Sequence, residues 1–123
     1  MRLFFAIIIA LSSAFTLRSG AEFYFLERNH DFTDTKEGVV LEHDFTFKNV
    51  GDQPLIISDY NVACTCTKIT YPTAPVMPGQ EGVVHLTFDT KGKYGFQSRK
   101  IELVSNAKKK VKLSFRVYVV NKS

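Results

Sequence analysis

The two cysteines of the chain, Cys64 and Cys66, are separated by a single threonine. Two thiols this close can form a disulfide, ligate a metal ion or act as a redox pair. On an extended strand, however, residues two apart point to the same face about 6.6 Å from one another. A disulfide needs Cβ atoms about 3.5–4.5 Å apart, so the backbone would have to bend sharply. A stabilising disulfide is therefore not expected, whereas a labile one fits an oxidising compartment.

A metal site is the second possibility. The cysteine pair could hold Cu(I), or share Zn(II) with nitrogen donors from His30, His43 or His85. His85 has the parity opposite to the core residues of its strand and is expected to face water. If the chain turns back on the strand of His43, Cys64 lies about 13 Å beyond the level of that histidine. We therefore predict no cofactor, and keep a copper or zinc site of Cys64, Cys66 and His43 as the alternative.

Redox or other catalytic chemistry is the third possibility. A redox pair is usually Cys-x-x-Cys at the start of a helix, and neither the spacing nor a helix is indicated here. The sequence has no Gly-x-Ser-x-Gly, His-Glu-x-x-His or phosphate-binding loop. Asp31, Asp34 and Glu37 could bind Ca²⁺, but a polar loop before a strand explains them better. No catalytic residue and no enzymatic activity are predicted.

The N-terminus has the pattern of a secretory signal peptide. Arg2 precedes an apolar run over residues 3–15, and small residues follow. Cleavage after Ala21 is the first choice and cleavage after Ala14 the second. The run is shorter than the about 20 residues that span a membrane. We expect an exported protein of the periplasm or cell envelope, with no membrane insertion after the signal is removed.

Removal of the signal peptide, residues 1–21, leaves residues 22–123 as one domain. The segment takes with it two of the 16 basic residues and none of the 12 acidic ones, which leaves a net charge of +2. This charge is too small to indicate nucleic-acid binding. The one basic cluster, residues 108–110, lies between two strand-like runs and fits a solvated hairpin tip. The expected partner is an envelope protein or peptide.

Apolar and polar residues alternate along most of the mature chain, which predicts strands with one buried face. Phe45, Phe47, Phe88 and Phe115 fall on the buried parity and are expected to form the core, since the chain has no tryptophan. The predicted strands are 22–27, 39–49, 54–62, 66–71, 82–89, 97–105 and 110–120. Seven short strands in about 100 residues are typical of an immunoglobulin-like antiparallel β-sandwich.

Three stretches, "HDFTFKNVGDQPLII", "ACTCTKITYPTAPVMPGQEG" and "LTFDTKGKYGFQSRKIELVSN", resemble a bacterial family of exported domains called domain of unknown function 1573 (DUF1573). The resemblance covers about residues 39–106 and implies an immunoglobulin-like fold, an envelope location and no enzymatic activity. The family usually has Ser-Cys-Gly-Cys where this chain has Ala-Cys-Thr-Cys. Residues that the resemblance marks as structural are Phe45, Phe47, Asn49, Gly51, Pro54, Thr67, Pro78, Gly79, Phe88, Asp89 and Asn106.

The sequence therefore predicts an exported, non-enzymatic binding or structural module of the cell envelope. The alternative is a periplasmic thiol-redox or copper- or zinc-binding protein that uses the Cys64-Thr65-Cys66 pair.

Overall fold

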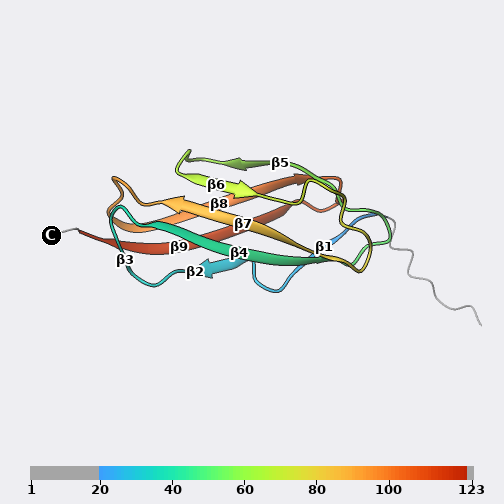
Figure 1. Ribbon diagram of the computed structural model, residues 1–123, viewed down its shortest axis with the longest axis horizontal. Coiled ribbons are helices and arrows are strands. Elements are labelled where there is room, and N and C mark those ends of the chain that lie inside the picture. The colour runs from blue at the N-terminus through green and yellow to red at the C-terminus, as the bar shows by residue number, and fades with distance from the viewer. Residues whose placement is uncertain (1–19, 122–123) are drawn as a thin grey trace, which may run out of the picture.

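The computed structural model describes residues 20–121, which form two β-sheets packed face to face (Figure 1). The nine strands are β1 (Phe23–Phe25), β2 (Asn29–Asp31), β3 (Thr35–Lys36), β4 (Val40–Asn49), β5 (Ile57–Val62), β6 (Thr67–Thr70), β7 (Glu81–Asp89), β8 (Gly95–Ser105) and β9 (Val111–Val120). Within residues 20–121 no helix is long and apolar enough to cross a membrane. The predicted all-β, immunoglobulin-like sandwich is confirmed.

One sheet has four strands in the order β1-β4-β7-β6, and its pairings are all antiparallel. The other has five strands, in the order β2-β9-β8-β5, with β3 also beside β9. The chain therefore changes sheets twice near the candidate sites. One of these crossings leaves the four-stranded sheet between β1 and β2. The other enters that sheet from the five-stranded one between β5 and β6, and β4 lies in the four-stranded sheet between the two crossings.

The seven predicted strands are present as β1 and β4–β9, but the count of seven is wrong, because β2 and β3 were missed. These two strands have three and two residues, too few for an alternating pattern to be visible in the sequence. Both pair parallel with β9. The five-stranded sheet is thus mixed, which corrects the prediction of a wholly antiparallel sandwich.

The core between the sheets is aromatic at its centre. Phe45, Phe47, Phe88 and Phe115 are each at most 1% exposed, in agreement with the alternation of their strands. The rings of Phe88 and Phe115 lie 4.9 Å apart and tilted, one from each sheet. Aromatic pairs at such distances add about 0.5–1.5 kcal/mol to the burial of their area.

Gly20 and Ala21 are the last two residues of the predicted signal peptide, and the rest of that segment lies outside the described residues. Ala21 is only 4% exposed. Gly20 exchanges two hydrogen bonds with Asp52, one to its carboxylate (2.6 Å) and one from its backbone N–H (3.0 Å). A Cβ atom on Gly51 would lie 2.2 Å from the Gly20 carbonyl oxygen, so glycine is required there. These two residues are therefore packed as part of the sandwich.

Candidate functional site

The cysteine pair lies in the turn between β5 and β6, where the chain changes sheets. The sulfurs of Cys64 and Cys66 are joined as a disulfide, with Cα atoms 5.2 Å apart. The Thr67 N–H donates to the Cys64 carbonyl at 3.1 Å, so the backbone makes the sharp bend that such a bond needs. The predicted strand from residue 66 accordingly begins one residue later, at Thr67.

The residues around the disulfide belong to the hydrophobic core and to the pairing of β6 with β7. Cys66 is half-buried and packs against the hydrophobic core, and its carbonyl accepts the Asp89 N–H at 2.9 Å. Thr67 is 2% exposed and pairs with Phe88 in the neighbouring strand. Because the bond joins residues two apart, it restricts the unfolded chain very little. In this position the cysteines complete a turn and part of the core.

His43 lies far from the cysteines. It pairs with Leu86, which pairs with Ile69 on β6. Cys66 is three residues before Ile69 and two strands away from His43, which amounts to about 14 Å. The predicted distance between Cys64 and His43 depended on the chain after Asn49 turning back beside β4. In the structure β4 pairs with β1 and β7 instead. The structure does not bring Cys64, Cys66 and His43 into one site.

His85 lies on the outer face of the four-stranded sheet, half-buried between two acidic residues of β4. Its Nδ1 contacts Asp44 at 2.5 Å and its Nε2 contacts Glu42 at 3.4 Å. The hydrogen bond to Asp44 is the main cause that raises the pKa of His85 above its ordinary value. This pair stabilises the fold most at low pH, and the contribution fades as the pH rises through the raised pKa. Since the site is largely open to solvent, the effect is small.

Two of the three acids that could have formed a calcium site, Asp31 and Glu37, have separate partners. Asp31 receives two hydrogen bonds from Arg116, at 2.7 and 2.8 Å, and these lower the pKa of Asp31. Glu37 accepts the Gly92 N–H at 3.3 Å. Among the described residues, Asp31, Asp34 and Glu37 do not form a group of carboxylates close enough to hold one ion.

Asn49 is the most extensively bonded of the family-motif residues. Its side chain is fully buried, at 0% exposure. The amide nitrogen donates to the carbonyls of Gln53 (2.8 Å) and Val76 (2.9 Å). The amide oxygen accepts the N–H groups of Gly51 (2.9 Å) and Glu22 (3.3 Å). One side chain thereby joins the end of β4, the turn after it, the start of β1 and the proline-rich segment.

Asn106 has the corresponding role at the end of β8. Its side chain accepts the Ile56 N–H and donates to the Pro54 carbonyl, each at 2.9 Å. Gly79 has a φ of 82° after Pro78, and its N–H donates to the Asn49 carbonyl at 2.8 Å. Glycine adopts this left-handed backbone without a steric cost. These motif residues hold turns and strand ends in place.

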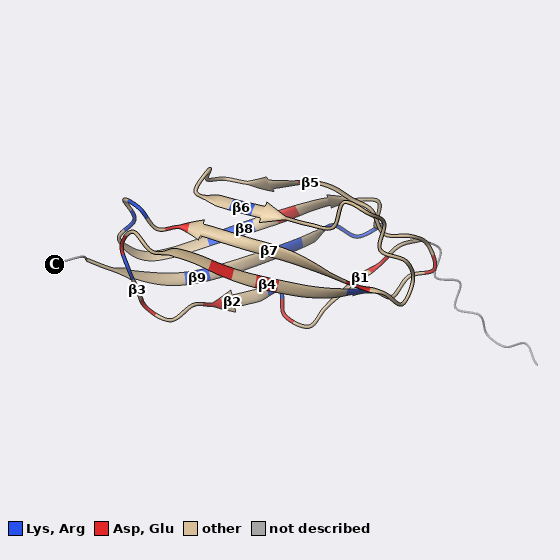
Figure 2. Cartoon of the chain, viewed as in Figure 1, with Lys and Arg blue, Asp and Glu red and all other residues tan. Residues whose placement is uncertain are grey.

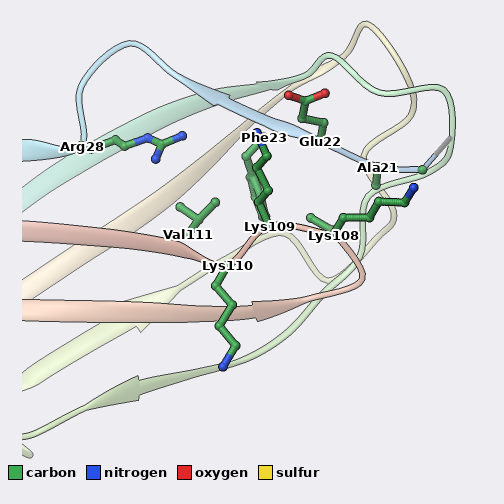
Figure 3. A pocket seen from close by; sticks show the side chains of 10 residues that line it. Ala21, Glu22, Phe23, Arg28, Lys108, Lys109, Lys110 and Val111 are labelled. Atoms are coloured by element: carbon green, nitrogen blue, oxygen red, sulfur yellow. The ribbon is translucent and has the colours of Figure 1, made fainter. Parts of the chain in front are cut away.

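None of the motif residues lines any of the four hollows found on the surface of residues 20–121. One of these four hollows has a volume of about 350 Å³ and lies between the β8–β9 turn and the segment before β1 (Figure 3). In Figure 3 the side chains of Lys108 and Lys110 point away from each other. Their charges do not converge on one anion, which agrees with the interpretation of this turn as a solvated hairpin tip.

Comparison with solved structures identifies the fold. A protein of unknown function from Porphyromonas gingivalis W83 superposes with a TM-score of 0.71 at 13% identity, over 85% of this chain and 50% of that one. The PapD-like domain 7 of human CEP192 gives 0.65 at 10% identity, over 85% and 89%. The VesB protease of Vibrio cholerae gives 0.60 at 12%, over 81% and 31%. This chain thus spans about half of the first protein, and at these identities the likeness concerns the fold alone.

A search of curated proteins found no significant match. The family model described as "Protein of unknown function (DUF1573)" matches residues 23–119, which include β1 and most of β9. That match includes the two hydrogen-bonding asparagines Asn49 and Asn106, the turn that holds the cysteines, and the phenylalanines of the core. The chain belongs to the DUF1573 family.

Proposed function

We propose that this protein is an exported, non-enzymatic binding module of the cell envelope that contacts a partner protein through the outer face of its five-stranded sheet. The observation that carries the proposal is an exposed aromatic pair. Phe96 on β8 and Tyr118 on β9 are directly opposite one another and are 63% and 50% exposed. Because exposed aromatic pairs are uncommon on surfaces that only face water, this pair indicates an interface.

The two aromatic residues border a shallow hollow. Phe96, Tyr118 and the half-buried Phe32 line it together with the Asp31–Arg116 ion pair. At protein interfaces a few residues supply most of the binding free energy, and these are often aromatic or arginine side chains that line a hollow. We infer that an apolar side chain of the partner enters here.

The charges nearby select the partner further. Lys100 lies four residues after Phe96 on β8, is exposed and has no ion pair within residues 20–121, whereas Lys112 on β9 lies opposite the acidic Glu102. Figure 2 shows basic positions on β8 and β9 and acidic positions along β4 of the other sheet. The matching surface on the partner is therefore apolar at its centre and acidic at its rim. The charge is spread over both sheets, which does not favour nucleic acid.

The sheet edges are less suitable for binding an extended peptide. β1, β2 and β3 have three residues or fewer, and β6 has four. The longer edge strand β5 is interrupted by a register shift between Ile57 and Asp59. Short and bulged edges resist pairing with another strand. An outer face is the better candidate.

The proposal is tested by photo-crosslinking in intact cells from a reactive residue introduced at Ser98, between the aromatic pair and Lys100 on the outer face. We expect one major adduct. For the purified partner, Phe96→Ser with Tyr118→Ser should weaken binding at least about 30-fold. Val83→Ser is the matched control, since Val83 is 42% exposed but lies on the other sheet. Equal loss in both variants, or unchanged binding in the aromatic variant, would contradict the proposal.

Export also requires a cleavage site, and the packing of Gly20 and Ala21 favours the second of the two predicted sites. Cleavage after Ala21 would remove a buried side chain and both hydrogen bonds to Asp52. We therefore expect mature protein in the envelope fraction to begin at Phe15. Mass spectrometry of the purified protein measures this. A mature chain that begins at Glu22, or an intact Met1 in the membrane fraction, would overturn the expectation.

A further inference from the structure

Three potential metal ligands meet at one edge of the sandwich. Glu27 lies in the segment that crosses from β1 to β2, His30 lies on β2, and His43 lies on β4. β2 belongs to the five-stranded sheet and β4 to the four-stranded sheet. The two imidazole rings therefore come from opposite sheets, and they stack with centroids 3.5 Å apart and an angle of 13° between their planes.

The donor atoms of these residues converge. Glu27 Oε1 lies 2.8 Å from His30 Nδ1 and 2.9 Å from His43 Nε2. All three ligand atoms lie within 4.8 Å of one another. Around a tetrahedral Zn²⁺ with bonds of about 2.0–2.1 Å, neighbouring donor atoms are about 3.3 Å apart. Outward shifts of about half an ångström would therefore bring the donor atoms to this spacing. Because the stacked rings lie in nearly parallel planes, one ring must also turn so that both nitrogen lone pairs point at the ion.

The rings are held in place by aromatic neighbours. Phe32 meets His30 edge to face at 4.6 Å, and Phe45 meets His43 in the same way at 4.8 Å. The histidine side chains are 24% and 23% exposed, and Glu27 is 47% exposed. Packing thus confines the rings on one side, while the carboxylate side remains open to water. An ion could enter without unfolding of the sandwich.

We propose that Glu27, His30 and His43 bind one divalent transition-metal ion, with Zn²⁺ as the probe, through one carboxylate oxygen and two imidazole nitrogens. Two imidazoles and one carboxylate suit zinc and leave a fourth position for water or a partner's side chain. The site uses neither cysteine. It adjoins the aromatic surface proposed above, because Phe32 contacts His30 and also lines that hollow. Because it joins the two sheets, bound metal stabilises the folded state.

The histidine at position 85 shows why acidic neighbours alone are not sufficient. His85 also contacts two carboxylates, but Asp44 faces Nδ1 and Glu42 faces Nε2. The two nitrogens point outward from the ring in divergent directions, so the two carboxylates and one nitrogen do not converge on a single ion. His85 is therefore a matched control of the same residue type.

The test is calorimetric titration of Zn²⁺ into chelator-treated mature protein purified without a histidine tag. We expect one ion per chain. The melting temperature should rise by about 10–15 °C when free Zn²⁺ is 100-fold above its dissociation constant. His43→Ala and His30→Ala should each weaken Zn²⁺ binding by at least about tenfold. Even the loss of a residue that only hydrogen-bonds to a metal ligand lowers metal affinity by about that factor. His85→Gln should leave the affinity unchanged.

Glu27→Gln guards against a folding artefact, since it keeps the size and hydrogen-bonding shape of the side chain while it removes the charge. This variant should also bind Zn²⁺ more weakly while its metal-free melting temperature stays near that of the wild type. No stoichiometric binding to the wild type would overturn the proposal. Binding that survives the loss of both His30 and His43, or that is lost with His85 or the cysteines instead, would overturn it as well.

Discussion

Replacement of Asn49 with alanine is expected to lower the free energy of unfolding by about 3–5 kcal/mol. The amide makes four hydrogen bonds and is fully buried. Its loss removes the side-chain partner of the Gln53 carbonyl and of the Gly51 and Glu22 N–H groups, at about 1–3 kcal/mol for each group that stays buried. The Val76 carbonyl keeps the Leu55 N–H as a donor. A cavity the size of the amide adds to this cost. Urea denaturation followed by circular dichroism measures the effect.

The control for this substitution is Asn61→Ala. Asn61 is exposed on the edge strand β5. Its replacement should change the free energy of unfolding by less than about 0.5 kcal/mol. If both substitutions lowered the free energy of unfolding by a similar amount, the four hydrogen bonds of the Asn49 side chain would not be important for the stability of the fold. A native-like stability of Asn49→Ala would show the same.

Replacement of Phe47 with alanine should cost about 3–5 kcal/mol. The ring is 1% exposed and contacts those of Phe23 and Phe25, at 5.1 and 5.4 Å between centroids. It also lies over Gly82, where a Cβ atom would come within 2.5 Å of the ring. Its removal therefore leaves a cavity that β1 and β7 border together. Thermal and urea unfolding both report this loss.

The neighbouring outward residues test the strand register. Thr46 and Lys48 flank Phe47 on β4 and are exposed. Alanine at either position should change the free energy of unfolding by less than about 0.5 kcal/mol. Equal sensitivity at both parities would be incompatible with the observed sheet.

The long strands could be predicted from the sequence because each has one buried face, so that its alternation extends over many residues. β4 and β9 show this best, with ten residues each. β2 and β3 could not be predicted, since their short runs are set by hydrogen bonds to β9 far along the chain. The pairing partner of β4 was also beyond the sequence, because local turn signals do not reveal which strand of a sandwich lies beside which.

The same limit applies to the sites. The cysteine turn could be described in part, because the covalent geometry of a disulfide demands a bend that the structure has. The meeting of His30 and His43 with Glu27 depends on the crossover between the sheets, and no local spacing indicates it. The exposed Phe96 lies one residue before the predicted strand 97–105, so the sequence did not assign it to a face of the sheet. That Tyr118 lies opposite Phe96 follows only from the register between β8 and β9.

The proposed binding surface around Phe96 and Tyr118 is distinct from the residues that build the fold, and the cysteines test this distinction. Cys64 and Cys66 complete a turn next to the core and lie outside the hollow that Phe96 and Tyr118 line. The most direct measurement is the affinity of the crosslinked partner for the double variant Cys64→Ser, Cys66→Ser, compared with the wild type. We predict unchanged affinity and a modest loss of stability, since a buried cysteine behaves as a small apolar residue. A reversible disulfide or a stoichiometric cysteine-bound metal whose loss abolishes partner binding would contradict the account.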